Sequence, residues 1–182
     1  ILYNMAKGCL NKLRGNVTVG CTIPLVGIKN IYLVHTDDVT FGVGGIDNST
    51  VISATMASGA VTILVEGYKQ NIQMTSAVRA MDASAKLDIV VSFKMSLTDV
   101  GADLRVRSLL TGKFYVLVER NDGANLIVGY TSPLECSGMD WDSNANAGLA
   151  TVTLSAPEGS AGNYFTRAST AAVTSIKAKV GD

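Results

Sequence analysis

The sequence LDIVVSFKMSL at residues 87–97 leads into TDVGADLRVRSLLTG (98–112), KFYVLVER (113–120), NDGAN (121–125) and LIVGYT (126–131). Apolar side chains alternate along 87–97, which is typical of a strand with one face toward the core. An Asp-Gly pair in a short loop between two apolar runs predicts a β-hairpin. The stretch therefore predicts strand, helix, strand, tight turn and strand, and it contains no set of residues suited to catalysis.

The helix in this unit is predicted at about residues 99–111. Thr98 is a suitable N-cap residue, and Asp99 in the first turn would interact favourably with the helix dipole. Gly112 is expected to end the helix in a left-handed C-terminal cap. The apolar stripe of the helix is expected to contain Val100, Leu104, Leu109 and Leu110.

The sequence on either side also predicts strands. Residues 28–35 are rich in β-branched and aromatic side chains, as strands are. Further strands are expected at 39–43, in two segments between 50 and 70, at 133–142 and at 149–154. Residues 70–85 fit neither the strand period nor the helix period, and we expect an excursion from the core there. The predicted fold is mainly β: an antiparallel β-sandwich or barrel with one flanking α-helix and extended terminal arms.

A chain of 182 residues suits one domain. We expect an N-terminal arm at residues 1–14 and a β-sandwich or barrel domain with one helix at 15–156. The sequence becomes small and polar after residue 156, which predicts a C-terminal arm at 157–182.

Charge and hydropathy exclude several classes of protein. Fifteen basic residues balance fifteen acidic ones, so the chain lacks the basic face with which nucleic-acid-wrapping proteins neutralise phosphates. No stretch reaches the roughly 18 apolar residues that span a bilayer, and no membrane association is expected. With 16% charged residues and no net charge, a free monomer gains little solubility, which favours a surface covered by neighbouring subunits.

Few residues suggest chemistry. His35 is the only histidine and lies beside Asp37 and Asp38, where we expect a structural or surface role. Adjacent strand residues such as these two acids point to opposite faces, so they and the acids at 140–142 are expected to be turn acids. The glycines at 42–45 lack the Lys and Ser/Thr that complete a phosphate-binding loop. We therefore predict no catalytic, metal-binding or cofactor-binding residues, and no cofactor.

The cysteines and basic residues do not indicate a functional site. Cys9, Cys21 and Cys136 form no CxxC or Cys/His cluster, so a zinc site is not expected. Free buried thiols of a reducing compartment are favoured over a disulfide. No RNA-binding aromatic motif accompanies the basic residues, which are expected on solvated faces or in salt bridges between subunits. The basic residues considered are Lys7, Lys12, Arg14, Arg105 and Arg107.

From Lys113 onward the chain resembles structural proteins of tailed bacteriophages and prophages, particularly those of Bacteroidetes hosts. The resembling segments are FYVLVERNDGANLIVGY (114–130), SPLECSGMDWDSN (132–144) and AGLATVTLSAPEGSAGNYF (147–165). The order of elements is also similar to tail-tube proteins and their relatives in injection machines, which have a β-sandwich or barrel, a flanking helix, arms and stacked rings. The chain lacks the signatures of the best-known tube families, so tube, neck-ring and capsid-associated roles all stay open.

The resemblance implies a non-enzymatic virion protein that is assembled in the cytoplasm of a bacterial host. It would self-assemble into rings of the tail tube or the neck, of which a hexamer is one form, and would contact other virion proteins. DNA would pass through such a ring without sequence-specific binding. The segments expected to make the contacts are 1–14, 42–50, 70–85 and 157–182.

Two other functions are considered. One is a binding module, namely a capsid decoration or fibre-attachment protein that docks on another virion protein. The other is a small β-sheet hydrolase that uses Asp37, Asp38 or Asp140. Closed contacts between copies would distinguish the ring protein from the binding module, and activity lost with the acids would indicate the hydrolase.

Overall fold

A computed structural model describes residues 27–45, 49–67, 70–80, 85–98, 100–160 and 163–181. In these residues the fold is mainly β, with eleven strands and two α-helices. The strands are β1 (Ile28–His35), β2 (Val39–Gly44), β3 (Thr50–Met56), β4 (Ile63–Glu66), β5 (Ile72–Ala80), β6 (Ala85–Met95), β7 (Lys113–Arg120), β8 (Asn125–Val128), β9 (Leu134–Trp141), β10 (Ala150–Ser155) and β11 (Thr166–Ala168). The helices are α1 (Ala102–Thr111), α2 (Thr170–Lys177) and the short 3-10 turns η1 (Thr36–Asp38) and η3 (Asn146–Gly148).

The strands form one mixed sheet in the order β2-β3-β11-β8-β7-β9-β10-β6-β5. β1 pairs with β7 outside this path and carries β4 on its other edge. All pairs of strands are antiparallel except β11 with β3. The expected mainly β fold is confirmed. The sheet does not close into a barrel, because β2 and β5 end the path without pairing to each other.

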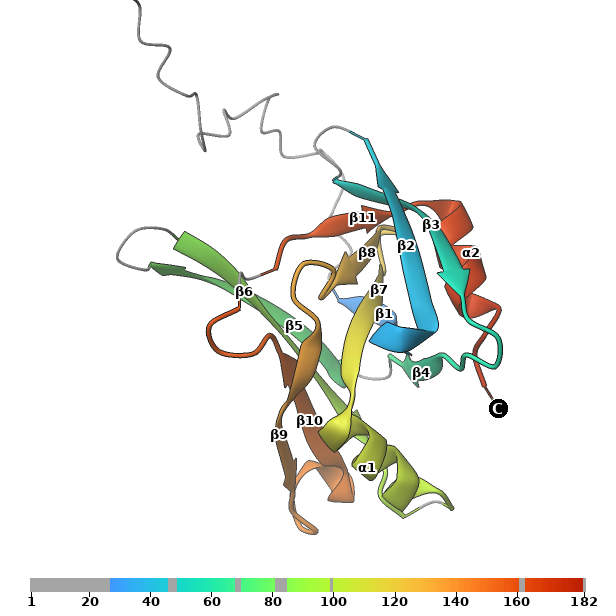
Figure 1. Cartoon of the computed structure of the whole chain (residues 1–182). Coiled ribbons are helices and arrows are strands. Elements are labelled where there is room, and N and C mark those ends of the chain that lie inside the picture. The colour runs from blue at the N-terminus through green and yellow to red at the C-terminus, as the bar shows by residue number, and fades with distance from the viewer. Residues whose placement is uncertain are drawn as a thin grey trace, which may run out of the picture.

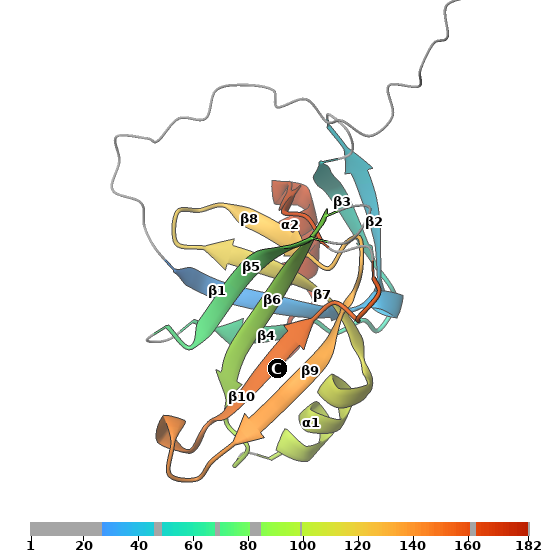
Figure 2. The same cartoon turned by 90° about the vertical axis from the view of Figure 1, so that its left-hand side faces the viewer.

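The strands gather in three groups (Figure 1). From the side, β5, β6, β10 and β9 cross in front of β1, β7 and β8 (Figure 2). On the other side of β1 and β7 lie β2, β3 and α2 (Figure 1). The strands β1, β7 and β8 therefore lie between two groups of elements and are covered on both faces.

Two hydrophobic clusters explain this layering. One face of β1, β7 and β8 contacts β6 and β10 through the first cluster, and the opposite face contacts β2, β3 and α2 through the second. In β1, Ile31 and Leu33 belong to the first cluster, whereas Tyr32 and Val34 belong to the second. Strands buried on both faces are apolar at every position, which is why IYLV and YVLV are continuous rather than alternating.

β6 shows the alternation that the sequence predicted. Ile89, Val91 and Phe93 are buried, and Leu87 and Met95 pack against the same cluster at its margins. The expected strand, helix, strand, turn and strand are β6, α1, β7, residues 121–124 and β8, so the prediction for this stretch is confirmed.

α1 begins three residues later than predicted. Its N-cap is Gly101 in a left-handed conformation (φ 89°), and no side chain caps the helix. Thr98 bonds instead to the hydroxyl of Ser96, and Asp99 lies outside the described residues. Gly112 is extended (φ −87°, ψ 159°) rather than left-handed. Its φ is open to any residue, but an added Cβ would lie 2.7 Å from the Ser108 carbonyl, so close packing accounts for this glycine.

The apolar stripe predicted for α1 is largely wrong. Val100, Leu104 and Leu110 are exposed, and only Leu109 of that set is buried, together with Ala102. The helix contacts the sheet mainly at β9. It is therefore a peripheral element that displays apolar side chains to its surroundings.

The C-terminal arm predicted at 157–182 is wrong where the structure describes it. Its residues form β11, which pairs with β3 and β8, and the second helix α2. Ala172, Val173 and Ile176 are buried against β3 and β1, and Ser169 caps the helix by accepting from the Ala172 amide. Three buried side chains attach the helix to the sheet, so a segment of mostly small and polar residues still belongs to the core.

Two further segments differ from expectation. Of the segment 70–85, residues 72–80 are not an irregular excursion, because they form β5, which pairs residue by residue with β6; residues 81–84 lie outside the described part of the chain. Its sequence period is weak because only its first residues face the core. The expected loop 42–50 is partly strand, since 42–44 complete β2 against β3. Residues 46–48 and the predicted arm 1–14 lie outside the described residues.

Candidate functional site

The acids beside the only histidine form a turn. His35 ends β1, and its Nδ1 accepts a hydrogen bond of 3.3 Å from the Asp37 amide. Its ring contacts Phe114 edge-on, with the centroids 5.9 Å apart. Asp37 and Asp38 belong to a single 3-10 turn, and both are at the surface of the molecule or near it. This arrangement caps a turn and contains no paired carboxylates around a cavity.

The second acidic group is also a turn. Asp142 accepts a 2.8 Å hydrogen bond from the Asn144 amide, and the Trp141 indole donates to the Gly148 carbonyl at 3.1 Å. Asp140 lies in β9 opposite Thr151 of β10. Among the described residues, no three His, Cys, Asp or Glu side chains lie close enough together to hold a metal ion. The geometry therefore offers no support to the hydrolase reading.

The other candidates from the sequence are accounted for structurally. Residues 42–44 are strand, so they do not form a phosphate-binding loop. Cys136 is a half-buried free thiol on β9. Arg107 forms a surface ion pair with Asp103 at 3.0 Å, one helical turn away. Cys9, Cys21, Lys7, Lys12 and Arg14 lie outside the described residues. No helix in the described part of the chain is long and apolar enough to cross a membrane.

β5 ends the sheet path in the described part of the chain, so one of its edges is open there. The Lys94 amide donates to the Asn71 carbonyl, which makes these two residues a hydrogen-bonded pair at the start of the β5–β6 ladder. Such pairs alternate along an antiparallel ladder, so every second residue of β5 bonds to β6. The residues whose N–H and C=O groups point to the open side are Ile72, Met74, Ser76 and Val78.

The outer half of this hairpin extends beyond the core. β10 pairs with β6 only from Val90 onward, so β6 before that residue is paired in the ladder with β5 alone. The two strands leave the body of the molecule together (Figure 1). Ser76 and Val78 are exposed, Val78 to 71% of its side chain. The hairpin thus presents backbone and apolar surface away from the rest of the molecule.

A second open edge belongs to β4. Thr62, just before β4, donates its amide to the Lys179 carbonyl and accepts from the Gly181 amide. Because its backbone groups point away from β1, those of Leu64 and Glu66 point the same way. The Glu66 carbonyl accepts a 3.0 Å hydrogen bond from the Asn71 side chain. Within the described residues, the Leu64 amide and carbonyl and the Glu66 amide have no hydrogen-bond partner.

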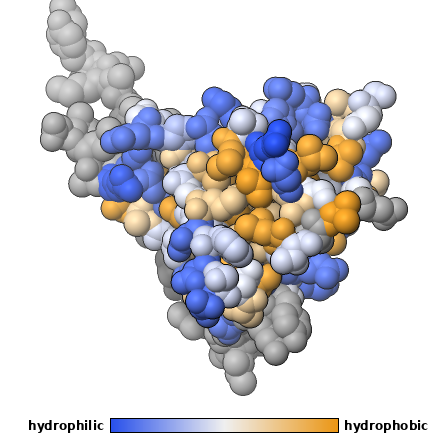
Figure 3. Space-filling view, turned by 90° about the horizontal axis from the view of Figure 1, so that it is seen from below, coloured by the Kyte–Doolittle hydropathy of each residue, from blue (hydrophilic) through white to orange (hydrophobic). Residues whose placement is uncertain are grey.

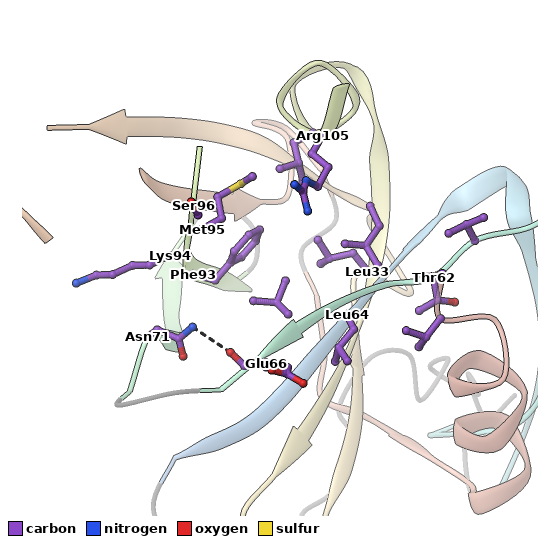
Figure 4. Close-up of a pocket in the computed structure, with 16 residues that line it drawn as sticks. Leu33, Thr62, Leu64, Glu66, Asn71, Phe93, Lys94, Met95, Ser96 and Arg105 are labelled. Carbon is purple, nitrogen blue, oxygen red and sulfur yellow. Dashed lines mark hydrogen bonds between the residues drawn. The ribbon is translucent and has the colours of Figure 1, made fainter. Parts of the chain in front are cut away.

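This β4 edge borders a groove of about 680 Å³ between β4, β6 and α1. Phe93 and Met95 of β6 and Arg105 of α1 reach toward the groove opposite β4, whereas Lys94 points away from the apolar side chains (Figure 4). The groove floor is mainly apolar. Its apolar lining consists of Leu33, Val61, Ile63, Leu64, Val65, Phe93, Met95, Leu109 and Val180.

The same end of the molecule has an apolar surface. Seen from below, hydrophobic surface extends across the middle of the face that carries α1 and is bordered by hydrophilic surface (Figure 3). Val61 is 54% exposed at the groove, and Leu104 on α1 is 71% exposed. An apolar centre with a polar rim is the usual composition of a protein interface.

A cluster of charged side chains lies on the face of β1 and β7 that α2 covers. The Glu119 carboxylate contacts the Lys177 ammonium of α2 at 3.0 Å and the Lys29 ammonium at 3.6 Å. It also accepts from Asn30 and from the Tyr32 hydroxyl. Partial burial raises the pKa of the Glu119 carboxyl, but the hydrogen bond and charge of Lys177, with Lys29, outweigh it and hold that pKa below its usual value. The cluster anchors α2 to β7.

No protein-family model matches the sequence, and no curated protein matches it at a significant level of similarity. The resemblance to phage structural proteins stays a prediction.

Sequence reasoning missed the β4 groove and the Glu119 cluster. β4 is a short ILVE run, and nothing in such a run indicates which of its edges is unpaired. Glu119 follows the apolar run YVLV directly, and a charge at that position was a signal that a partner lies nearby. Its partner Lys177 is far away in sequence, so only the fold identifies it.

Proposed function

We propose that this chain is a non-enzymatic structural protein of a tailed-phage virion that self-assembles into rings, as a tail-tube or neck protein. The observation that carries the proposal is the open, unprotected edge of β5. A neighbouring copy would pair a strand with this edge, and repetition around a closed ring would satisfy every copy alike.

The sequence of β5 lacks the devices that keep sheet edges from pairing. Soluble monomers protect long edges with prolines, lysines, inward-pointing charges or bulges. β5 reads IQMTSAVRA, and its register with β6 runs without a shift from Ile72 to Ala80. Its one charged residue, Arg79, is bound to Asp88 of the same hairpin at 2.6 Å. By contrast, β2, the other end of the sheet path, has an irregular register at Gly42.

The charge and surface of the chain suit close packing of copies. The net charge is zero, so copies do not repel one another strongly, and a lumen built from them would not hold DNA by phosphate contacts. The exposed Trp141 at the end of β9 would be covered by a neighbour.

The test uses two single substitutions on the β5 edge in the full-length chain. Ser76→Pro removes an amide that points to the open side, so the β5–β6 ladder keeps its hydrogen bonds. Val78→Lys places a charge on the same edge. We expect the unaltered chain to form rings by electron microscopy and light scattering, and both variants to give smaller species with an unchanged circular dichroism spectrum.

The matched control is Val100→Lys, which makes the same exchange at a fully exposed valine outside the sheet. It should leave the rings intact. A chain that stays monomeric over a wide range of concentration, or rings that survive both β5 substitutions, would overturn the proposal. Binding of such a monomer to a preformed capsid or tail lattice would instead favour the decoration or fibre-attachment role.

A further inference from the structure

The sheet path ends in two different strands, β5 at one end and β2 at the other. In the described part of the chain β2 pairs with β3 alone, so β2 also has an open edge there. The two strands do not meet within one copy, because seven strands lie between them along the path (Figure 1). Pairing between β5 and β2 therefore requires two copies.

The hydrogen bonds of β2 show which of its backbone groups point to the open side. The Ala57 amide donates to the Asp38 carbonyl at 2.8 Å, so these residues form a hydrogen-bonded pair just before the ladder of β2 with β3 begins. Such pairs alternate along an antiparallel ladder, so the N–H and C=O groups of Val39 and Phe41 point to the open side. The register shifts after Gly42, where the regular part of this edge ends.

The outer half of β5 offers an edge of the same length. Ser76 and Val78 are exposed, and their backbone groups point to the open side. Antiparallel pairing of the two edges sets Val78 opposite Val39 and Ser76 opposite Phe41. Each of these pairs would exchange two backbone hydrogen bonds.

This register also brings opposite charges together, because it sets Arg79 opposite Asp38. Residues directly opposite each other share a face of the sheet, with their Cβ atoms about 4.5–5.5 Å apart. Arg79 binds Asp88, which also holds Lys86 at 3.4 Å, so two cations share one carboxylate within the hairpin. The Arg79 side chain is 69% exposed, and its guanidinium has donors for a second carboxylate.

The charges distinguish this register from its neighbours. A shift of two residues in either direction would set Arg79 opposite Thr36 or Thr40 and lose the opposite charge. A shift of one residue would turn the backbone groups of one strand away from the other.

The other open edges suit β5 less well. At β4, Thr62 is already bonded to residues 179–181, and the Glu66 carbonyl is bonded to the Asn71 side chain. Within the described residues, Leu64 alone keeps both outward groups of that strand open. Two β5 strands paired about a twofold axis would close at a dimer and leave β2 open.

We propose that the β5 edge at Ser76 and Val78 pairs antiparallel with the β2 edge of the next copy at Phe41 and Val39. This inference deepens the proposed function and rests on it, since it names the strand that covers the β5 edge. Repeated from copy to copy, the contact joins the sheets into one continuous sheet around the ring and leaves no free end.

The first experiment mixes two full-length variants that each lack one edge. Ser76→Pro blocks β5 and keeps β2. The double variant Asp38→Lys and Thr40→Lys keeps β5 but puts two lysines on the β2 edge, one of them opposite Arg79. Each should stay monomeric alone by light scattering and native mass spectrometry. An equimolar mixture should form a dimer of one copy of each and nothing larger, because both remaining edges are blocked.

The matched control is the double variant Asp140→Lys and Thr55→Lys. It makes the same two exchanges at exposed residues, so the change of net charge is identical. Thr55 lies directly opposite Thr40 on β3, one strand in from the edge. This variant should form the same rings as the unaltered chain.

The second experiment measures hydrogen exchange at the Phe41 amide and needs no lysine variant to fold. We expect this amide to exchange slowly in rings of the unaltered chain and rapidly after dilution to monomer. In the mixture, it should become slow again in the Ser76→Pro copy. The Thr40 amide points to β3 and should be protected in every state.

Several results would overturn this inference and leave the proposed function standing. Rings formed by the lysine double variant would show that β5 pairs with another edge, and a dimer of that variant alone would show that β5 pairs with itself. A Phe41 amide that exchanges rapidly in rings, or stays protected in dilute monomer, would also contradict the contact. Failure of the proposed function is seen separately, as an unaltered chain without rings or as rings that survive Ser76→Pro.

Discussion

Glu119 joins the C-terminal helix to the centre of the sheet. Its carboxylate on β7 is held by Lys177 of α2, whose ammonium also lies 5.1 Å from the centre of the Tyr32 ring. Burial lowers the pKa of Lys177, but the hydrogen bond from its ammonium to Glu119 outweighs this and raises that pKa above its ordinary value. Each partner therefore favours the charged form of the other, which makes the attachment of α2 dependent on pH.

We predict that Glu119→Gln lowers the free energy of unfolding by about 1.5–3 kcal/mol at neutral pH, the usual worth of a hydrogen bond to a charged group. The folded pKa of Glu119 lies below the unfolded value of about 4.5, so its contribution is complete above that pH. The contribution is lost as pH falls through the folded pKa. Urea unfolding from pH 7 to pH 3 should show the two proteins converging at the acid end.

The matched control for this prediction is Glu135→Gln. Glu135 also bonds a lysine at 3.0 Å, but its side chain is 39% exposed against 15% for Glu119. An exposed ion pair contributes roughly 0–1 kcal/mol, so this variant should change little. Equal losses in the two variants, or a Glu119→Gln deficit that is the same at pH 3 and pH 7, would contradict the role given to Glu119.

Gly112 provides a second test at a single position. Its Cβ would lie 2.5 Å from the Phe114 ring and 2.7 Å from the Ser108 carbonyl. Gly112→Ala should therefore destabilise the protein by about 1–3 kcal/mol, as overpacking does in other cores. The control is Gly138→Ala, whose added Cβ would meet nothing within 4 Å. Thermal unfolding measures both, and a stabilised Gly112→Ala variant would show that the end of α1 can relax.

The two helices differ in what they contribute. α2 has eight residues of modest apolarity, yet Ile176 is 1% exposed and lies in the second cluster. α1 is longer, but only Ala102 and Leu109 of its apolar residues are buried, whereas Leu104 and Leu110 are exposed. Hydrophobic periodicity predicted α1, which has an apolar pattern in the sequence. Burial depends instead on which helix packs against the face of the sheet, and here that helix is α2.

We predict that Ile176→Ala lowers the free energy of unfolding by about 2–5 kcal/mol, because it empties a buried site. Leu104→Ala makes a comparable truncation on α1, where the side chain is 71% exposed, and should change stability by less than about 0.5 kcal/mol. Chemical denaturation at equal protein concentration compares the two. Similar losses would mean that α1 is covered in the protein as measured.

Whether a strand could be predicted from the sequence also depends on where it lies in the fold. β1 and β7 could be predicted with their observed bounds because β-branched and aromatic residues occur at nearly every position. β5 could not, because Ile72 and Met74 face the core while Ser76 and Val78 lie beyond it, so the apolar pattern stops midway along the strand. A strand that leaves the core shows no period for its outer half.

Across the whole molecule, hydrogen exchange should reproduce the layers and the open edges. In dissociated protein, the amides of β1 and β7 should be the most protected, since both faces of these strands are buried. Along β5, the Thr75 and Ala77 amides should be protected and those of Ser76 and Val78 should exchange rapidly. On assembly, the Ser76 and Val78 amides should become protected. Uniform protection along β5 in the monomer would refute the register derived for its edge.

The sequence alone determined the mainly β class, the central strand–helix–strand–hairpin unit and the exclusion of the familiar catalytic and metal motifs. These follow from local periodicity, turn residues and spacing, which are properties of neighbouring residues. Only the tertiary structure decided that the sheet stays open, that residues 163–181 pack on the core, that β5 ends the sheet, and that β4 borders a groove. Those features depend on which strands pair and which face a helix covers, and such contacts join residues as distant as Glu119 and Lys177.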